Sequence, residues 1–232
     1  MRQKPLGDRT TAPAQVVLAA VLQVRKRVLQ ALLWQRAREP FSGAWGLPGG
    51  ALGPDETLDG SIRRQLAAKV DVREVAHLEQ LGSWSEPDRH PGHRELATAF
   101  LGLVPTDVDP ELPADTAWHV VDDLPTLAFD HAEIVLAARE RLRGKLSYTN
   151  VGFALAPTTF TLSEVRDLYA AALGHDVSAT NLKRVLLRRD VLEPTGSRRE
   201  PGRTGGRPAE VYRFRSRKLE ITDPFAALRP PA

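Results

Sequence analysis

The spacing of hydrophobic residues alternates between strand-like and helix-like periods along the first part of the chain. The apolar runs VVLAAVLQV and LQALLWQRA, separated by the basic stretch RKR, predict two strands joined by a turn. Leu58, Ile62, Leu66 and Val70 follow at every fourth position and predict an amphipathic helix after a loop rich in Gly and Pro. Residues 72–84, 93–105 and 118–125 have strand-like patterns, and residues 129–146 have a helical one. We therefore expect helices and strands packed around one sheet.

The last part of the chain has a different order of elements. LSEVRDLYAAAL and SATNLKRVLLRRD predict two helices, with Thr161 or Ser163 capping the first, Gly174 ending it and Ser178 opening the second. VLEPTGSRREPGRTGGRPAEVYRF then predicts two short strands around a tip rich in Gly, Pro and Arg. Helix, turn, helix and basic hairpin is the order of a winged helix-turn-helix.

Composition suggests where these units begin and end. We expect a flexible basic arm at residues 1–13, a mixed-sheet domain at 14–143, a linker at 144–157, a winged helix-turn-helix at 158–218 and a tail at 219–232. The linker is placed on the small, uncharged stretch SYTNVGFALAP, which ends at Pro157. The fold class is α/β in the broad sense (α+β), with the sheet domain first.

Positive charge is concentrated in the second unit. The chain has a formal net charge of +3, yet residues 183–218 alone carry 12 basic and 4 acidic side chains. This density of Lys and Arg is expected of a surface that contacts phosphates.

Other features of the composition narrow the class of protein. There is no cysteine, which excludes disulfides and thiolate metal sites. No stretch has the apolar length of a signal peptide or a membrane span. We therefore expect a cytoplasmic protein that does not contact a membrane.

One motif in the first unit is typical of chemistry on diphosphates. The skeleton of a Nudix box is matched by Gly49, Gly50, Glu56, Arg64, Leu66 and Val72. Nudix hydrolases gather carboxylates on one helix face, because a divalent metal on a diphosphate needs negative oxygen ligands. Where the family has Arg-Glu-apolar-x-Glu-Glu-x-Gly, this chain has RQLAAKVD, so all three carboxylates are missing and Lys69 places an ammonium at a ligand position. We expect a Nudix-like fold that does not hydrolyse; the alternative is an ordinary amphipathic helix after a glycine turn.

Longer segments point to one family. HLEQLGSWSEPDRHP, LAFDHAEIVLAARERLRGKL and SYTNVGFALAPTTFTLSEVRDLYAAALG, followed by a winged helix, resemble the NrtR family of Nudix-related transcriptional regulators over about residues 14–215. The resemblance implies a homodimeric repressor of NAD biosynthesis and metabolism genes that requires no cofactor. Its Nudix domain is expected to bind ADP-ribose or NAD as effector, and its winged helix a palindromic operator in double-stranded DNA. The alternatives are an active Nudix pyrophosphohydrolase with a nucleic-acid-tethering winged helix, and a nucleotide-binding scaffold without a regulatory role.

The candidates for effector binding are Arg36, Arg38, Trp45, Gly49, Gly50, Glu56, Arg64 and Arg89. Arg36 and Arg38 precede the box, where guanidinium groups suit bidentate contacts to a diphosphate. Trp45 either stacks on an adenine or packs in the core. Arg64 either braces the loop or contacts the ligand, and the loop that holds Arg89 either covers the nucleotide or is a solvated turn.

The six histidines are scattered without a metal-ligand spacing. His90 and His93 are the nearest pair, beside Asp88, but a polar loop has this composition without any metal. We therefore assign no metal site, and we expect His131 to be a cap or a packing residue at the start of a helix.

The helix SATNLKRVLLRR has the pattern of a recognition helix. Its apolar stripe is expected to face inward, with short or polar side chains at its start and basic ones a turn later, which suits the major groove. We assign DNA binding to Ala179, Thr180, Asn181, Lys183, Arg184, Arg188, Arg198, Arg199, Arg203 and Arg207, the last four in the hairpin. The alternative is a solvated basic face. Tyr212 and Phe214 are expected to anchor the hairpin in the core.

Overall fold

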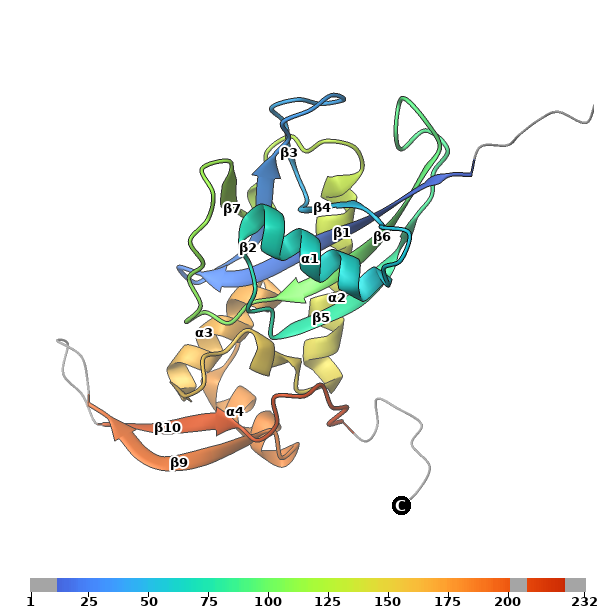
Figure 1. Ribbon diagram of the computed structural model, residues 1–232. Coiled ribbons are helices and arrows are strands. Elements are labelled where there is room, and N and C mark those ends of the chain that lie inside the picture. Colours follow the sequence, from blue (N-terminus) through green and yellow to red (C-terminus); the bar gives the residue numbers. More distant parts are fainter. Residues whose placement is uncertain (1–11, 201–207, 224–232) are drawn as a thin grey trace, which may run out of the picture.

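The computed structural model describes residues 12–200 and 208–223 of the chain. Figure 1 shows a twisted sheet with helices on both sides and, below it, a smaller helical unit with a long hairpin. These two units are the mixed-sheet domain and the winged helix-turn-helix expected from the sequence, so the predicted fold class is confirmed. Most of the expected arm and tail lies outside the described residues.

The sheet is built around the long strand β1 (Ala14–Arg25). β2 (Val28–Gln35) pairs with β1 antiparallel, and β6 (Glu95–Leu103) pairs with it in parallel. The strand order is β3-β2-β1-β6-β5, with β4 also beside β1 and β7 beside β2; the remaining bounds are β3 (Trp45–Gly46), β4 (Gly49–Ala51), β5 (His77–Trp84) and β7 (Thr116–Val120). Side chains of β1 are buried on both faces, which explains why its sequence is continuously apolar and does not alternate.

Helix α1 (Leu58–Val70) covers one face of the sheet. The Thr57 side chain caps it by accepting a hydrogen bond from the Gly60 N–H at 3.1 Å. Ile62, Leu66 and Val70 are buried against the sheet, as their spacing predicts. The helix ends at Asp71 in the left-handed conformation (φ 51°), the position at which the Nudix pattern has glycine.

Helix α2 (His131–Tyr148) covers the opposite face, preceded by the short 3₁₀ turn η1 (Val121–Asp123). The stretch 144–157, expected to be a linker, is not a loose connection. Its first residues continue α2, and η2 (Val151–Ala154) and the residues up to Ala156 are buried between the two units. This stretch is small and uncharged because it packs in the core that both units share.

The winged helix follows with the expected order of elements. Their bounds are β8 (Phe160–Thr161), α3 (Leu162–Leu173), α4 (Ala179–Arg188), β9 (Leu192–Arg199) and β10 (Ala209–Phe214). Thr161 and Glu164 form a capping box at α3, Gly174 ends α3 with φ 77°, and Ser178 caps α4. Tyr212 and Phe214 are buried, as expected of wing anchors.

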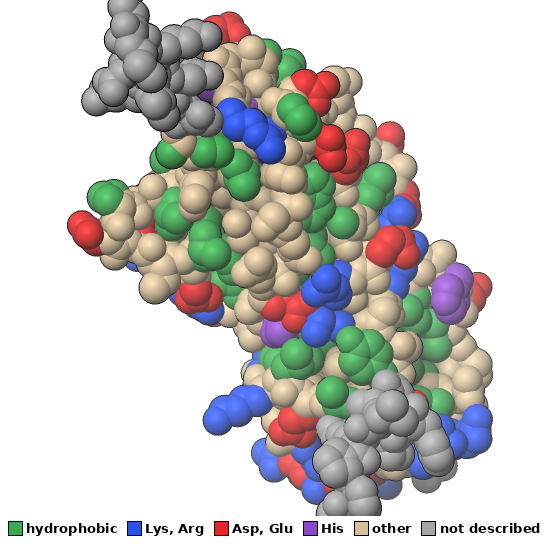
Figure 2. All heavy atoms as spheres, turned by 90° about the vertical axis from the view of Figure 1, so that its right-hand side faces the viewer, with side chains coloured by type: hydrophobic (Ala, Val, Ile, Leu, Met, Phe, Trp, Pro, Cys, Tyr) green, Lys and Arg blue, Asp and Glu red, His purple; other side chains and the backbone are tan. Residues whose placement is uncertain are grey.

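Besides the shared hydrophobic core, polar contacts also join the two units. Arg189, just after α4, donates hydrogen bonds to the carbonyl oxygen of Thr149 at 2.8 Å and to the Thr222 hydroxyl at 3.0 Å. Arg27, in the turn between β1 and β2, forms an ion pair with Asp167 of α3 at 2.5 Å. Figure 2 shows one face of the molecule, on which many of the visible Lys and Arg side chains lie at the lower end, around the winged helix. Among the described residues, no helix is long and apolar enough to cross a membrane.

Candidate functional site

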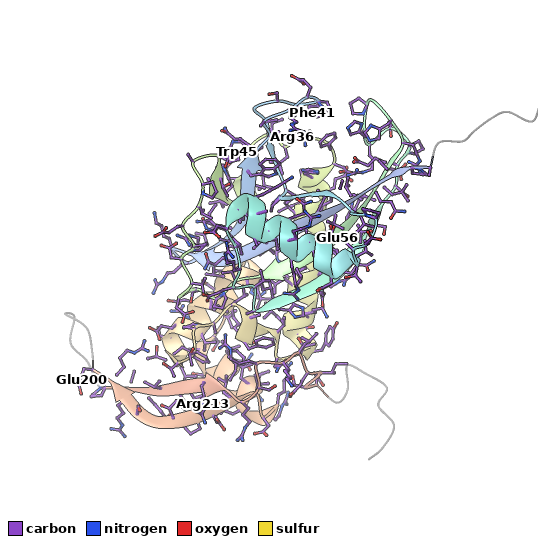
Figure 3. The ribbon with its side chains drawn as sticks, viewed as in Figure 1. Arg36, Phe41, Trp45, Glu56, Glu200 and Arg213 are labelled. Carbon is purple, nitrogen blue, oxygen red and sulfur yellow. The ribbon has the colours of Figure 1, made fainter. Side chains whose placement is uncertain are left out.

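A pocket lies where the ends of β2 and β4 meet α1 and the start of α2. Its walls include Trp34, Arg36, Gly49, Gly50, Lys69 and Phe129. Three of the eight sequence-predicted effector residues, namely Arg36, Gly49 and Gly50, are therefore brought together. Figure 3 shows Arg36, Phe41 and Trp45 at the same end of the sheet and Glu56 at the start of α1.

Gly49 and Gly50 are required by the close approach of neighbouring atoms. A Cβ atom on Gly49 would lie 2.1 Å from the carbonyl oxygen of Val17. A Cβ atom on Gly50 would lie 2.7 Å from Nε2 of Gln65, which is buried beneath it. The two glycines therefore let the turn pack closely against β1 and the Gln65 side chain.

Lys69 is the central cation of the pocket. Its ammonium donates a hydrogen bond to the carbonyl oxygen of Gly49 and lies 4.5 Å from the ring centroid of Trp34. Burial lowers the pKa of Lys69, and the positive charges of Arg36, Arg64 and Arg38 lower it further. Three guanidinium groups therefore repel the Lys69 ammonium, and an anion bound beside it would relieve that repulsion.

Glu56 and Arg64 form a brace and not a metal site. Arg64 donates to both carboxylate oxygens of Glu56, at 2.7 Å for the Nη2 contact, and the Gly53 N–H donates to the same carboxylate at 3.0 Å. The hydrogen bonds from Arg64 are the largest cause of the lowered pKa of Glu56, which is about 2. The bracing alternative for Arg64 thus matches the structure.

The residues of the box do not fit the divalent cation that a Nudix hydrolase uses. A carbonyl oxygen and clustered carboxylates are the ligands such an ion needs. Here the Gly49 carbonyl already accepts a hydrogen bond from Lys69, and Glu56 is engaged by Arg64. The positions of the missing carboxylates hold Gln65, Ala68 and Lys69.

An aromatic cluster adjoins the pocket at Phe129, which is one of its lining residues. The Arg36 guanidinium lies 4.6 Å from the ring centroid of Phe129, and its Nε donates to the Pro40 carbonyl at 2.9 Å. Phe129 contacts the ring of Phe41 edge-on at 4.9 Å, and Phe41 is exposed. Burial lowers the pKa of Arg36, although its guanidinium remains charged. A partly exposed aromatic surface thus adjoins the Arg36 guanidinium.

Five of the predicted effector residues do not line the pocket, and Trp45 and Arg38 are two of them. The ring of Trp45 packs edge-on against His119 at 4.4 Å and borders the core, which matches the packing alternative. Arg38 is exposed and acts on the pocket through its charge on Lys69.

Arg89 is a buried structural residue behind the pocket and not part of a cover over it. Its guanidinium donates to both carboxylate oxygens of Asp130, at 2.9 and 2.8 Å, and also pairs with Glu95. Its side chain is 1% exposed, so it holds the loop 85–94 against the start of α2. The polar sequence around Arg89 did not indicate that this side chain would be buried.

His131 fixes the first turn of α2 to the pocket wall. The Leu47 N–H donates to its Nδ1 at 2.9 Å, and burial lowers the pKa of His131 to about 3, so it is neutral at pH 7. The expected packing role is confirmed. Sequence reasoning missed Trp34 and Phe129 and did not place Lys69 in a binding site. The available signal was that Lys69 occupies a position where the Nudix box has a carboxylate.

Helix α4 presents the predicted recognition surface. Leu182 and Leu186 are buried, whereas Ala179, Thr180, Asn181, Arg184 and Arg188 are exposed. Arg184 donates to the Asn181 side-chain oxygen at 2.8 Å, so the two polar groups are held on one face. No carboxylate lies within 4.0 Å of Arg184 or Arg188 in the described part of the chain.

The remaining predicted DNA contacts differ in their surroundings. Lys183 is half-buried, with its ammonium 5.6 Å from the ring centroid of Tyr212, so it packs on the wing as well as facing out. Arg199 pairs with Glu164 at the start of α3, and Arg198 is exposed. Arg203 and Arg207 lie outside the described residues.

Comparisons with known proteins match both units. A family model described as NUDIX domain matches residues 13–138, and one described as NrtR DNA-binding winged helix domain matches residues 152–214. The crystal structure of Shewanella oneidensis NrtR complexed with a 27mer DNA is similar with a TM-score of 0.76 and 32% identity, over 87% of this chain and 93% of that one. The chain belongs to the NrtR family. The resemblance noted in the sequence is thereby confirmed.

Further relatives of this NrtR-family chain differ in their described activities. The ADPR responsive transcriptional repressor NtrR of Acinetobacter baylyi is 29% identical over 220 residues, 92% of this chain and 86% of that protein. The NUDIX domain of Shewanella oneidensis NrtR complexed with ADP ribose has a TM-score of 0.50 and 31% identity, over 57% of this chain and 90% of that one. An ADP-ribose pyrophosphatase of Methanocaldococcus jannaschii is 32% identical over 110 residues, 45% of this chain and 62% of that protein.

Proposed function

We propose that this NrtR-family chain is an ADP-ribose-responsive transcriptional repressor of genes for NAD metabolism. The observation that carries the proposal is the pairing, in one chain, of a cationic pocket at Gly49, Gly50 and Lys69 with an exposed basic helix α4. The relatives support both halves, since one was crystallised with DNA and its Nudix domain with ADP ribose.

The diphosphate of ADP-ribose fits the pocket by charge. Lys69 and Arg36 supply positive charge on two sides of the bare Gly49–Gly50 backbone, and Arg36 offers bidentate contacts. Phe41 is exposed beside the same cations and offers a surface on which an adenine can stack. We assign the diphosphate to Lys69 and Arg36, the adenine to Phe41, and a positioning role to Arg64 and Arg89.

The pocket binds its ligand without hydrolysing it. Attack on a diphosphate needs a group that activates water and neutralises the developing charge, which the box metal supplies in Nudix hydrolases. Lys69 can neutralise charge, but an ammonium bonded to a carbonyl does not bind and ionise a water molecule. The rival function, an active pyrophosphohydrolase, is favoured only by the likeness of the first domain to the archaeal ADP-ribose pyrophosphatase.

Helix α2 connects the two sites and is the proposed route of coupling. Its first turn is fixed to the pocket by His131, and Asp130 just before it holds Arg89. At the other end of α2, Arg189, which follows α4, donates a hydrogen bond to the carbonyl oxygen of Thr149, the C-cap of α2. A ligand that shifts the start of α2 thus moves the recognition helix, and operator and effector must bias one equilibrium reciprocally.

We further propose that the protein acts as a homodimer on an inverted repeat. A winged helix reads a short half-site, and two-fold symmetry in the protein requires symmetry in the DNA, with half-sites ~10 bp or a multiple apart. Binding is expected to weaken steeply with salt, because Lys and Arg displace counterions from the phosphates.

The test is fluorescence anisotropy with the promoter DNA of the protein's own gene neighbourhood. The full chain should bind this DNA and not a scrambled duplex of equal length. ADP-ribose should release it, and NAD titrated separately identifies the preferred nucleotide. Binding to neither DNA, or release by neither nucleotide, would contradict the repressor proposal.

A further inference from the structure

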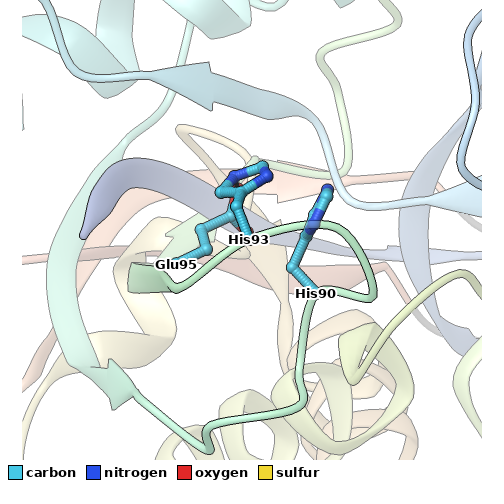
Figure 4. A group of neighbouring side chains, drawn as sticks. All are labelled: His90, His93 and Glu95. Carbon is cyan, nitrogen blue, oxygen red and sulfur yellow. Dashed lines mark ion pairs between the residues drawn. The ribbon is translucent and has the colours of Figure 1, made fainter. Parts of the chain in front are cut away.

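A second cluster of side chains lies at the rim of the effector pocket, and no contact with the effector has been assigned to it. His90 and His93 come from the loop after β5, and Glu95 is the first residue of β6. One ring nitrogen of each histidine and a carboxylate oxygen of Glu95 lie within 4.8 Å of one another. Figure 4 shows the three side chains converging from this loop and the strand that follows it.

The separations suit a small metal ion. In tetrahedral coordination at bond lengths near 2.1 Å, two ligand atoms lie about 3.4 Å apart. Nε2 of His93 and Oε2 of Glu95 are 3.6 Å apart, and the ring centroids of His90 and His93 are 3.9 Å apart. The three donor atoms lie within 4.8 Å of one another, and side-chain rotations that turn both imidazole planes toward one point would bring them around one ion.

The carboxylate is already oriented by a buried partner. Arg89, itself 1% exposed, pairs with Oε1 of Glu95, which leaves Oε2 directed at His93. Asp130 holds the same guanidinium with both oxygens, so the two carboxylates together carry one more negative charge than Arg89 neutralises. Such outer partners of a ligating carboxylate fix its direction and raise metal affinity.

The two histidines differ in how they are held. His90 stacks on Phe129, with ring centroids 5.3 Å apart and an angle of 20°. His93 is 50% exposed and can turn. One contact opposes the site: the Gly92 N–H donates to Nδ1 of His90 at 3.1 Å, and this exposed hydrogen bond must open when His90 becomes a ligand.

We propose that His90, His93 and Glu95 form a binding site for a divalent transition metal of the zinc class. Two imidazoles and one carboxylate suit zinc and its neighbours, whereas magnesium prefers oxygen ligands alone. From the sequence alone we assigned no metal site, because a polar loop has this composition without any metal, and the neighbour considered for the histidine pair was Asp88. The loop 85–94 joins the antiparallel strands β5 and β6, and the structure places Glu95, the first residue of β6, beside the two histidines.

The site adjoins the effector pocket but is separate from the degenerate Nudix box. His90 and Glu95 line the pocket, and three protein ligands leave a coordination position for water or for a ligand oxygen. A metal at this rim would add positive charge beside the cations that are proposed to bind the diphosphate.

The test is calorimetric titration of zinc chloride into the full chain, prepared without a polyhistidine tag and stripped of metal by a chelator that is then removed. We expect one zinc ion per chain. His93→Ala, and His90→Phe, which keeps a ring against Phe129, should each weaken binding at least tenfold. His175→Ala, an exposed histidine in the winged helix, is the matched control and should bind as the wild type does.

Cobalt(II) gives a second readout, because its visible absorption spectrum reports coordination by nitrogen and oxygen ligands. Tenfold weaker zinc binding in both test variants, with the cobalt spectrum lost, supports the site; any other pattern, including no binding by the wild type, overturns it. Neither measurement contains DNA or ADP-ribose, so their failure would leave the repressor proposal standing.

Discussion

The ammonium of Lys69 donates a hydrogen bond to the carbonyl oxygen of Gly49. In the Nudix box, this helix position holds a carboxylate that helps to bind a metal ion, and the glycine lies at the turn that the diphosphate approaches. A cation covalently attached to the chain thus replaces one that must be captured from solution. We propose that this exchange retains electrostatic attraction for a diphosphate and removes the group that would activate water.

The charge of Lys69 should be needed for effector binding. Lys69→Met keeps most of the stem and removes the ammonium, and hydrogen bonds to charged groups contribute about 1.5–3 kcal/mol. We expect ADP-ribose affinity to fall by ~10- to 100-fold in calorimetry. Arg63→Met, on the exposed side of the same helix, is the control and should bind normally. Equal affinities in the two variants would show that the diphosphate is bound elsewhere.

The wild-type protein should not hydrolyse ADP-ribose or NAD. Chromatography should detect no AMP above a protein-free control, with magnesium and manganese each supplied in excess. The variant that combines Gln65→Glu, Ala68→Glu and Lys69→Glu restores the family's carboxylates and should gain magnesium binding. Wild-type turnover that disappears in Glu56→Gln would mean that another carboxylate set completes a catalytic site, and the hydrolase alternative would replace the sensor.

Arg184 should contribute to operator binding more than a charge elsewhere on the surface. It is exposed and held by Asn181 on the recognition face, so Arg184→Ala should cost about 1–3 kcal/mol of operator affinity. Lys183→Ala should cost less, because Lys183 is partly engaged with Tyr212. Anisotropy measures both, with Arg73→Ala after α1 as the control. Unchanged operator affinity in the Lys183 and Arg184 double alanine variant would show that α4 does not recognise the operator.

Glu79 should make the free energy of unfolding depend on pH in the acid range. Burial alone would raise its pKa, but hydrogen bonds and charge from His77 and Lys145, the latter at 2.9 Å, lower it from 4.5 to about 2. A carboxyl with a lowered folded-state pKa stabilises the protein above pH 4.5, and this contribution is lost as pH falls toward 2. Glu79→Gln should lower the free energy of unfolding by roughly 2 kcal/mol at pH 7 and by much less near pH 2.

Urea denaturation at both pH values measures this difference. Glu74→Gln, an exposed position just before the same strand, should leave the stability at pH 7 nearly unchanged. A Glu79→Gln loss of the same size at both pH values would show that the effect comes from packing and not from ionisation.

The sequence predicted most of the fold because its signals are local. The four-residue spacing of Leu58, Ile62, Leu66 and Val70, and the caps at Gly174 and Ser178, depend only on neighbouring residues, and the structure agrees. The linker prediction failed because lack of charge marks both loose connections and buried junctions. Only the three-dimensional packing distinguishes Val151–Ala154 as core.

The candidate site was predictable only in part, because it depends on contacts between distant segments. The box glycines and Arg36 were found from motif spacing. Phe129 and Glu95 approach the pocket from segments far along the chain, and Arg89 is buried by Asp130, which lies 41 residues away. No local pattern carries that information, so Arg89 was placed among the effector contacts and Lys69 was recognised only as a departure from the box.

The most direct measurement is calorimetric titration of ADP-ribose into the full chain, once in EDTA and once in magnesium. Lys69, Arg36 and the glycine turn are proposed to hold the diphosphate without a box metal, so the dissociation constant in EDTA should stay within about threefold of that in magnesium, a difference below ~0.7 kcal/mol. Loss of binding in EDTA, restored by magnesium, would show that a metal ion and not Lys69 holds the diphosphate.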